Sequence, residues 1–580
     1  MNRQPGHFAE PEYWNRVRTS IIGHDSFIET PFGSRRLFYA DHTASGRGVT
    51  FIEDSVREDL ALYGNTHTED DATGIITSRR LRAAEQTIKR LVNAGPAHKL
   101  VPVGAGTTAA VHLLQQILGI SVPPAAKEFY LKVLRAALTA SQYDDVTRRL
   151  SAEQPVVFVG PYEHHSNEVS WRECLAQVVE IELTPEGLLD LDDLRAKVSR
   201  EEFAGRRKIG AFSAASNVTG VKTPVLEVAR ILHEHDALAC FDYAALAPYG
   251  PIDMRPAEDC VLDAVYFSAH KFLGGPGSAG ILIFHERIYR ADLPPMVGAG
   301  GTVDFVNFDG QTYTADIEAR ETPGTPAILQ TVRAGLAMKL QEDLGFGHIE
   351  QREKELAAYA YSRLSTNPRL VLMGDVGPEH RLPIFSFNVR VGSSWLHPRF
   401  IAALLNDLFG IQSRAGCSCA APYGHRILHI DMTTSRELRR SIMCGNIGLK
   451  PGWARVNFHF LSTDEEVDFL CDAILFVAER GKSFLPLYDF DIRTGSWRYR
   501  GFDARVGPIL ERYEGTQGRP APLSALDARE LHARYLREAD ERACAAERHW
   551  SDTEVKSTEK DLFPFVYVHE VANGELRGAE

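Results

Sequence analysis

Short apolar runs alternate with amphipathic stretches between about residues 100 and 290. The runs at 156–159, 209–212, 237–241, 264–267 and 280–284 predict buried strands. The stretches at 191–202 and 223–235 repeat their apolar residues at helical spacing and predict helices between those strands. This alternation predicts an α/β domain with a largely parallel sheet, whose functional side chains lie beyond the carboxyl ends of the strands.

The same kind of pattern divides the rest of the chain. A helix is predicted over residues 77–93, ahead of the stop signals Gly95 and Pro96. Residues 330–480 form a second α/β unit, with a strand at 382–388 and a helix at 398–408. We therefore expect an N-terminal segment (1–35), a large domain (36–330), a small α/β domain (331–485) and a C-terminal extension (486–580). One helix is predicted in the extension, from Ser524 to about Trp550.

Composition narrows the classes of function. The net charge of −13 argues against a general nucleic-acid binder, which needs basic patches to neutralise phosphates. No stretch reaches the roughly 20 apolar residues that span a bilayer, and the first residues lack the apolar stretch of a signal peptide. Eight cysteines in 580 residues are too few for a disulfide framework. The sequence predicts a cytoplasmic enzyme that binds neither nucleic acid nor membrane.

The segment most informative about a catalytic site follows the strand predicted at 264–267. This strand runs into Ser268, His270 and Lys271, and a glycine-rich loop comes next. A lysine at a strand end suits Schiff-base chemistry, because removal from water lowers its pKa and frees the amine. It could equally be an ordinary surface lysine. The preceding strand ends in Asp242, which could cap a helix or pair with the protonated ring nitrogen of a cofactor.

Two further strand-end segments carry weaker signals. Residues 104–108 (Gly-Ala-Gly-Thr-Thr) precede an apolar segment, and small residues at a helix start expose backbone N–H groups to an anion. The Walker pattern and G-x-G-x-x-G are both missing from this loop, which argues against nucleotide binding. His164 follows the strand at 156–159, where a histidine could stack on a flat ring, carry a proton or be purely structural.

A small-residue loop after Arg414 holds two cysteines, Cys417 and Cys419. A thiol in such a loop is accessible, and a neighbouring positive charge stabilises a thiolate, so we expect a nucleophile here. With His425 and His429 the two cysteines could instead bind zinc, but their spacing does not match the common zinc-ligand patterns. We therefore expect no metal site.

Taken in order, these segments resemble the class V aminotransferase family. Its members are pyridoxal-phosphate enzymes of fold type I (aspartate-aminotransferase-like), an α/β fold with a large, mostly parallel domain and a smaller α/β domain. The resemblance covers about residues 36–480 and is nearest to the cysteine desulfurase and selenocysteine lyase group. It rests on eight motifs in the family's order: Gly-Thr-Thr108, Glu-His164, Ser-Asn217-Val-Thr-Gly, Asp242, Ser-Ala-His-Lys271, Gly-Thr325-Pro, Arg-x-Gly-x-x-Cys419, and Arg455 ahead of Ser-Thr-Asp-Glu-Glu-Val-Asp468.

The resemblance implies a homodimer that binds pyridoxal phosphate and acts on an amino acid, with cysteine as the substrate and a sulfur-acceptor protein as a further partner. Lys271 would hold the cofactor covalently and move protons, and His164 would stack over its ring. Cys419 would take sulfur as a persulfide and leave alanine. The other implied contacts are Asp242 to the pyridine nitrogen, Gly106, Thr107, Thr108, Ser268 and His270 to the phosphate, Thr325 to the phosphate of the other subunit, Asn217 to the ring hydroxyl and the substrate carboxylate, Arg455 to that carboxylate, and Arg414 to the cysteine loop.

The chain also departs from the family. Ala245 stands where the family usually has Gln, and Cys417 is an extra thiol. The segments near 121–153 and between Cys419 and Arg455 are long, and the C-terminal extension has no counterpart in compact members. Two other hypotheses for the function stay open. One is a lyase, epimerase or aminotransferase that uses pyridoxal phosphate on another amino acid without a persulfide. The other is a non-catalytic scaffold on the same fold.

Overall fold

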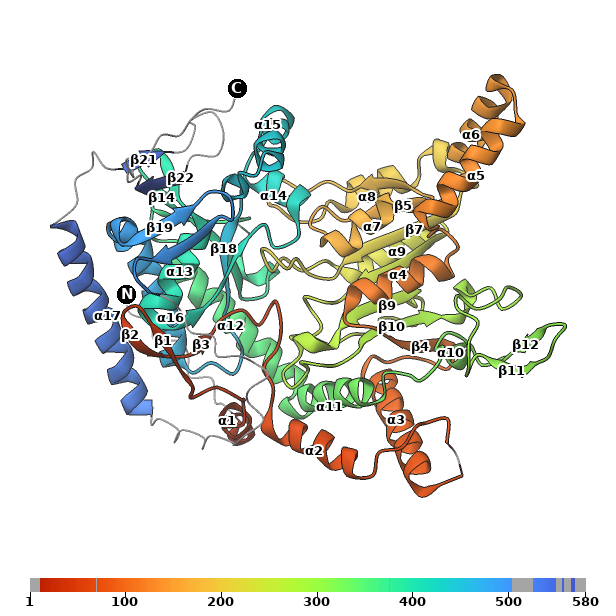
Figure 1. Cartoon of the computed structure of the whole chain (residues 1–580), viewed down its shortest axis with the longest axis horizontal. Coiled ribbons are helices and arrows are strands. Elements are labelled where there is room, and N and C mark those ends of the chain that lie inside the picture. Colours follow the sequence, from red (N-terminus) through yellow and green to blue (C-terminus); the bar gives the residue numbers. More distant parts are fainter. Residues whose placement is uncertain are drawn as a thin grey trace.

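The larger unit of the protein is built on a seven-stranded sheet (Figure 1). The computed structural model describes residues 11–68, 70–374, 376–502, 525–548, 555–557 and 565–568. The strand order is β4 (His98–Val103), β10 (Gly280–His285), β9 (Ala264–Ser268), β8 (Ala237–Asp242), β7 (Lys208–Ser213), β5 (Val156–Val159) and β6 (Gln177–Glu180). Neighbours run parallel except β10, which is antiparallel to both β4 and β9. The five predicted strands are confirmed to within one residue at each end.

Both faces of this sheet are buried, which explains why its strands read as unbroken apolar runs. In β5, Val156 and Phe158 pack into one core, whereas Val157 and Val159 pack into another. The first core also receives side chains from α3 (Ala72–Leu91), α8 (Leu191–Val198), α9 (Val225–Glu234) and α11 (Ile328–Leu344). The second receives them from α4 (Thr107–Ile117) and α7 (Val169–Arg172).

The helix predicted from residue 77 is α3, and its predicted start was wrong by five residues. Its N-cap is Asp71, whose Oδ1 accepts a hydrogen bond of 2.7 Å from Gly74 N. Gly74 lowers the helix propensity of this first turn, which hid the start. The glycine is needed because a Cβ there would lie 1.8 Å from the Thr68 carbonyl oxygen.

The second unit has a sheet with the order β17 (Arg414–Gly416), β18 (Trp453–Asn457), β14 (Ile384–Val391), β15 (Ser394–Leu396), β22 (Phe565–Val568) and β21 (Val555–Ser557); β13 (Leu370–Leu372) also pairs with β14. It is covered by α12 (Phe346–Leu364), α13 (Pro398–Phe409) and α16 (Asp464–Arg480). The strand predicted from residue 382 begins at 384, because Pro383 has no N–H for a ladder. The antiparallel pairing of β17 with β18 sets Arg414 directly opposite Arg455.

Segments from both ends of the chain pack on this second unit. The hairpin of β1 (Phe27–Thr30) and β2 (Gly33–Arg36) leads to β3 (Phe38–Tyr39), which pairs with β16 (Ile411–Gln412). The helix predicted in the extension is α17 (Ala525–Glu547), which runs along the edge of the unit in Figure 1. It buries Tyr535, Ala539 and Ala543 in the same core as α13 and α16. The predicted helix ends, Ser524 and Trp550, lie outside the described residues.

The long segments noted in the sequence form helices that project from the two units. Residues 121–153 make the hairpin of α5 (Pro124–Ala137) and α6 (Ala140–Glu153), which reaches outward in Figure 1 and buries no side chain. The segment after Cys419 makes α14 (Ala421–Ile427) and α15 (Met432–Met443). The other elements are α1 (Glu12–Thr19), α2 (Thr50–Ala61), α10 (Ile317–Arg320), β11 (Val303–Val306), β12 (Gln311–Tyr313), β19 (Tyr488–Asp491) and β20 (Ser496–Tyr499), together with short 3₁₀ turns. Within the described ranges, no helix combines the length and the apolar character needed to cross a bilayer.

Candidate functional site

A cavity of about 220 Å³ opens where β7, β8 and β9 end at one edge of the large sheet. This is the edge at which parallel sheets bind ligands. All the site residues proposed from the sequence except Cys419 and Thr325 line it. The lining comprises Thr43, Ala44, Ala105, Gly106, Thr107, Thr108, His164, Ser166, Ser213, Ala215, Asn217, Asp242, Ala244, Ala245, Ser268, His270, Lys271, Arg414 and Arg455.

Lys271 and Asp242 form the charged floor of the cavity. Lys271 ends the 3₁₀ turn η3 (Ala269–Lys271) directly after β9, and Asp242 is the last residue of β8. Burial lowers the pKa of the Lys271 ammonium to about 8, against the opposing charge of Asp242. Burial also raises the pKa of Asp242 to about 6, against the hydrogen bond of 2.8 Å from Ala244 N. Near pH 7.5 a substantial fraction of the lysine is therefore a neutral amine beside a mostly ionised carboxyl group.

One wall of the cavity is an anion cradle at the start of α4. Thr107 is the first residue of this helix, and its N–H and hydroxyl both contact Ser268 Oγ, at 2.8 and 2.7 Å. Gly106 has a φ of +83°, and a Cβ there would lie 3.0 Å from Ser268 Oγ and 3.6 Å from His270 Nε2. The helix N-terminus supplies backbone N–H donors and the positive end of the helix dipole.

His164 also lines this cavity, as a neutral ring near Lys271. Its Nδ1 accepts a hydrogen bond of 3.2 Å from Ser166 N, so the ring proton belongs on Nε2. Burial lowers the pKa of His164 to about 3, and the positive charge of Lys271 adds to this effect. A neutral, flat imidazole can stack on an aromatic ring without adding a second positive charge beside the lysine.

Two arginines, Arg414 and Arg455, bring positive charge to the lining of the cavity. Arg455 is 1% exposed; its Nη1 donates to the Asn217 carbonyl oxygen at 2.8 Å and its Nη2 to Asp41 Oδ1 at 2.8 Å. Arg414 faces it from the neighbouring strand. Two guanidinium groups held side by side attract an anion, and a carboxylate matches their planar donor geometry.

The two cysteines lie on different sides of the loop that follows Arg414. Cys419 Sγ is 3.8 Å from Nη2 of Arg414, which lines the cavity. The loop is held by hydrogen bonds of 2.8 Å from His165 N to the Cys419 carbonyl oxygen and from Asn217 Nδ2 to the Ser418 carbonyl oxygen. Cys417 instead lines a separate apolar cavity. The loop geometry thus separates two thiols that the sequence alone sets two residues apart.

Thr325 lies away from the cavity, where its hydroxyl accepts a hydrogen bond of 3.1 Å from Asn65 Nδ2. Sequence reasoning missed the contribution of residues 41–45 to the site: Thr43 and Ala44 line it and Asp41 pairs with Arg455. No periodic pattern or motif in the segment marks it, and the Asp41–Arg455 contact joins residues 414 positions apart. Ser166, Ser213 and Ala215 were also missed, although each follows or ends a strand predicted to point at this edge.

Comparison with known proteins gives the same fold and a family. The model of the class-V aminotransferase family matches residues 139–470. The chain is 27% identical over 443 residues to a probable cysteine desulfurase of Halalkalibacterium halodurans, covering 76% of this chain and 92% of that protein. It is 28% identical over 460 residues to a probable cysteine desulfurase of Staphylococcus epidermidis, covering 78% and 95%.

Solved structures of similar proteins share the architecture. The cysteine desulfurase of Thermococcus onnurineus NA1 matches with a TM-score of 0.61 at 21% identity, over 80% of this chain and 98% of that one. The cysteine desulfurase CsdA of Escherichia coli matches with a TM-score of 0.59 at 22% identity, over 80% and 98%. The chain therefore has the α/β fold type I architecture that the motifs imply. Because the family model also spans more than half of its residues, the chain belongs to the class-V aminotransferase family.

Proposed function

We propose that this protein is a pyridoxal-phosphate enzyme that removes sulfur from cysteine, leaving alanine and a persulfide on Cys419. The observation that carries the proposal is the placement of Cys419 Sγ against Arg414, which lines the same cavity as Lys271 and Asp242. The names of the relatives support the same substrate. A reducing compartment keeps such a thiol available, which favours the cytoplasm.

The residues of the cavity fit pyridoxal phosphate. Gly106, Thr107 and Ser268 form a cradle that a side chain at 106 would fill, as a phosphate group requires. Asp242 lies where a carboxylate can bond a protonated ring nitrogen, and His164 offers a neutral face for the ring. Asn217 Oδ1 is buried without a hydrogen-bond partner among the described residues, and it faces this cavity. Lys271 offers a partly neutral amine for covalent attachment.

When bound, pyridoxal phosphate stabilises the negative charge left on Cα after a proton is removed. The chain's own residues would do the rest. Arg455 and Arg414 hold the substrate carboxylate and so fix Cα near Lys271. Lys271 Nζ takes the proton from Cα and later returns a proton to the carbon skeleton.

Sulfur transfer would then use Cys419. Its thiolate attacks the sulfur of the bound cysteine, a sulfur–sulfur bond forms, and the carbon–sulfur bond breaks with its electron pair going to the substrate carbon. That carbon is protonated and leaves as alanine. Substrate cysteine and one enzyme thiol thus become alanine and one enzyme persulfide, with no outside oxidant. A sulfur-acceptor protein or another thiol would then regenerate Cys419.

The test compares two serine variants of the same loop. Cys419→Ser should abolish sulfide release from cysteine in the presence of a thiol reductant, whereas Cys417→Ser should only slow it. Binding of pyridoxal phosphate, followed by its visible absorbance, should survive both changes because neither thiol lines the cofactor cavity. If Cys419→Ser still releases sulfide and alanine from cysteine at the wild-type rate, a persulfide on Cys419 is excluded. If the wild type instead turns over another amino acid and Cys419→Ser does so equally well, a lyase, epimerase or aminotransferase without a persulfide replaces the proposal.

A further inference from the structure

A second cavity, of about 210 Å³, lies between α14, α15 and β18. It shares no lining residue with the cofactor cavity. Its walls are almost entirely apolar: Leu428, Ile430, Leu438, Ile442, Met443 and Trp453. An apolar cavity of about 150 Å³ can bind a benzene molecule, so this one has room for a ring or a short alkyl chain.

The walls of this cavity are held in place by specific contacts. Trp453 is fully buried, and its Nε1 donates to Ser418 Oγ at 3.2 Å. His425 joins the two helices, with Nδ1 2.8 Å from the Ala421 carbonyl oxygen and Nε2 2.9 Å from Ser435 Oγ. Gly424 lets α14 approach the indole, because a Cβ there would lie 3.1 Å from the Trp453 ring.

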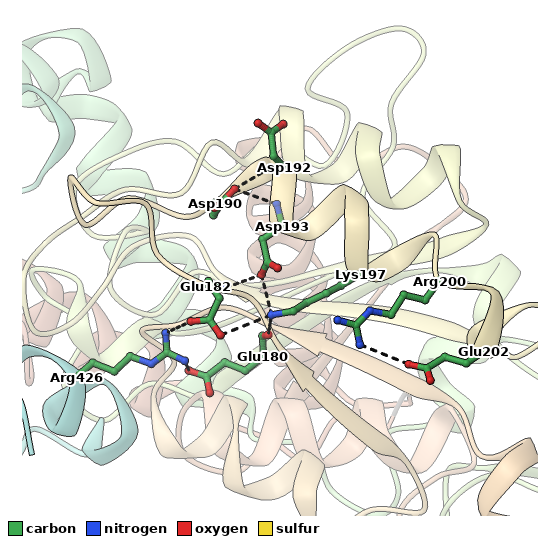
Figure 2. Close-up of polar contacts among 9 residues, drawn as sticks. All are labelled: Glu180, Glu182, Asp190, Asp192, Asp193, Lys197, Arg200, Glu202 and Arg426. Carbon is green, nitrogen blue, oxygen red and sulfur yellow. Dashed lines mark hydrogen bonds and ion pairs between the residues drawn. The ribbon is translucent and has the colours of Figure 1, made fainter. Parts of the chain in front are cut away.

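α14 itself is anchored to the large sheet. Arg426 Nη2 pairs with Glu180 Oε1 at 2.9 Å and its Nη1 with Glu182 Oε2 at 2.7 Å. Figure 2 shows this guanidinium reaching between the two carboxylates, within a larger acidic network that also holds Lys197. The charge of Arg426 is thus already balanced.

The charges at the mouth of the cavity are not balanced in this way. Arg439 and Lys450 line it and are exposed, and neither has an ion-pair partner in the part of the chain that the structure describes. Residues 421–450 hold five Arg or Lys and two Asp or Glu, in a chain whose net charge is −13. An apolar interior with an unbalanced positive rim is complementary to a molecule with an apolar body and one negative group.

We propose that this cavity binds a small apolar carboxylate, with its hydrocarbon part between α14 and α15 and its carboxylate at Arg439 and Lys450. Cys417 lines the cavity, so a bound ligand covers this thiol. Cys419 lines neither this cavity nor the cofactor cavity, and it stays uncovered. Cys417 therefore reports on binding, and Cys419 serves as an internal control that binding should leave unchanged.

The experiment uses the full chain loaded with its cofactor and octanoate as the probe. N-ethylmaleimide is added, and modification of Cys417 and Cys419 is followed by tandem mass spectrometry. Saturating octanoate should slow modification of Cys417 at least tenfold and leave that of Cys419 unchanged. Octylammonium, with the same chain and the opposite charge, should give no protection.

Calorimetric titration with octanoate tests the rim. Arg439→Glu should weaken binding about tenfold or more, because it places a like charge at the carboxylate. The matched control is Arg436→Glu, which lies on the same helix outside the cavity lining and should leave the affinity unchanged. Lys450→Gln, outside α15, should also weaken binding, and it keeps the test available if Arg439→Glu unfolds the helix.

Three results would overturn the proposal. Octanoate that fails to protect Cys417, or octylammonium that protects it equally, shows that no carboxylate site exists. Equal affinity in Arg439→Glu and Arg436→Glu removes the role of the rim. A Cys417 that resists maleimide without octanoate and becomes reactive on dilution means that a second copy of the chain covers the cavity. None of these readouts needs turnover, so they stay independent of the desulfurase proposal.

Discussion

Capture of pyridoxal phosphate by Lys271 should follow a pH midpoint far below that of an ordinary lysine. The amine attacks a carbonyl group only when it is neutral. Burial lowers the pKa of Lys271 to about 8 from an ordinary value of 10.5. Because the buried ammonium loses its proton at a lower pH than in water, the neutral fraction of Lys271 rises with pH through about 8 and then levels off.

The expected effect is large. At pH 7 a pKa of about 8 leaves about a tenth of the amine neutral, whereas a pKa of 10.5 leaves about 0.03%. If the neutral amine is equally reactive in both settings, the protein environment speeds capture about 300-fold at this pH. The rate should therefore rise about tenfold between pH 6 and 7 and flatten above pH 8.

The assay mixes apoprotein with pyridoxal phosphate and follows the visible absorbance at each pH. Lys271→Ala should show no covalent capture. The charges of Asp242 and Asp41 both raise the pKa of Lys271, Asp242 more strongly. Asp242→Asn should therefore move the midpoint below 8, and Asp41→Asn should move it in the same direction by less. A rate that continues to rise tenfold per pH unit up to pH 10 would refute the reasoning, because that is the behaviour of an amine in water.

Other predictions concern stability and assembly. Asp41→Ala leaves the buried Arg455 guanidinium without its carboxylate, so urea denaturation should show a free energy of unfolding lower by about 3 kcal/mol. A loss below about 1 kcal/mol would mean that water replaces the carboxylate. Tyr535→Ala should cost about 3–5 kcal/mol in the same assay, and the matched Tyr535→Phe only about 1 kcal/mol for the hydroxyl that bonds Arg36 N. If Thr325 serves the site of a neighbouring subunit, the protein should sediment as a dimer, and a monomer that binds pyridoxal phosphate tightly would rule this out.

The large sheet could be predicted from the sequence because its strands are buried on both faces. Each strand then forms a continuous apolar run, and its last residue marks the ligand edge; Asp242 and Ser268 were located in this way. Lys271 follows from the same rule, with the family motifs supplying its role. These signals are local, and they lie within a few residues of a strand end.

What could not be predicted depends on contacts between distant segments. The pairing of Asp41 with Arg455, and the cavity between α14 and α15, have no local sequence signal. The separation of Cys417 from Cys419 depends on the backbone of the loop, where Ser418 and Cys419 adopt positive φ values of 51° and 56°. Non-glycine residues rarely take this conformation, so composition alone gives no warning of it.

The packing of α17 has a consequence for how the chain is made. The hairpin of β1 and β2 leaves the ribosome well before α17, yet Arg35 and Arg36 contact Glu538 and Tyr535, about 500 positions later. The core that receives Tyr535, Ala539 and Ala543 therefore stays open until α17 has been synthesised. A nascent chain whose apolar surface stays open while about 500 further residues are added is exposed to aggregation during that time. Chains that terminate before residue 525 would keep that surface open after release, and would then depend on chaperones to remain in solution.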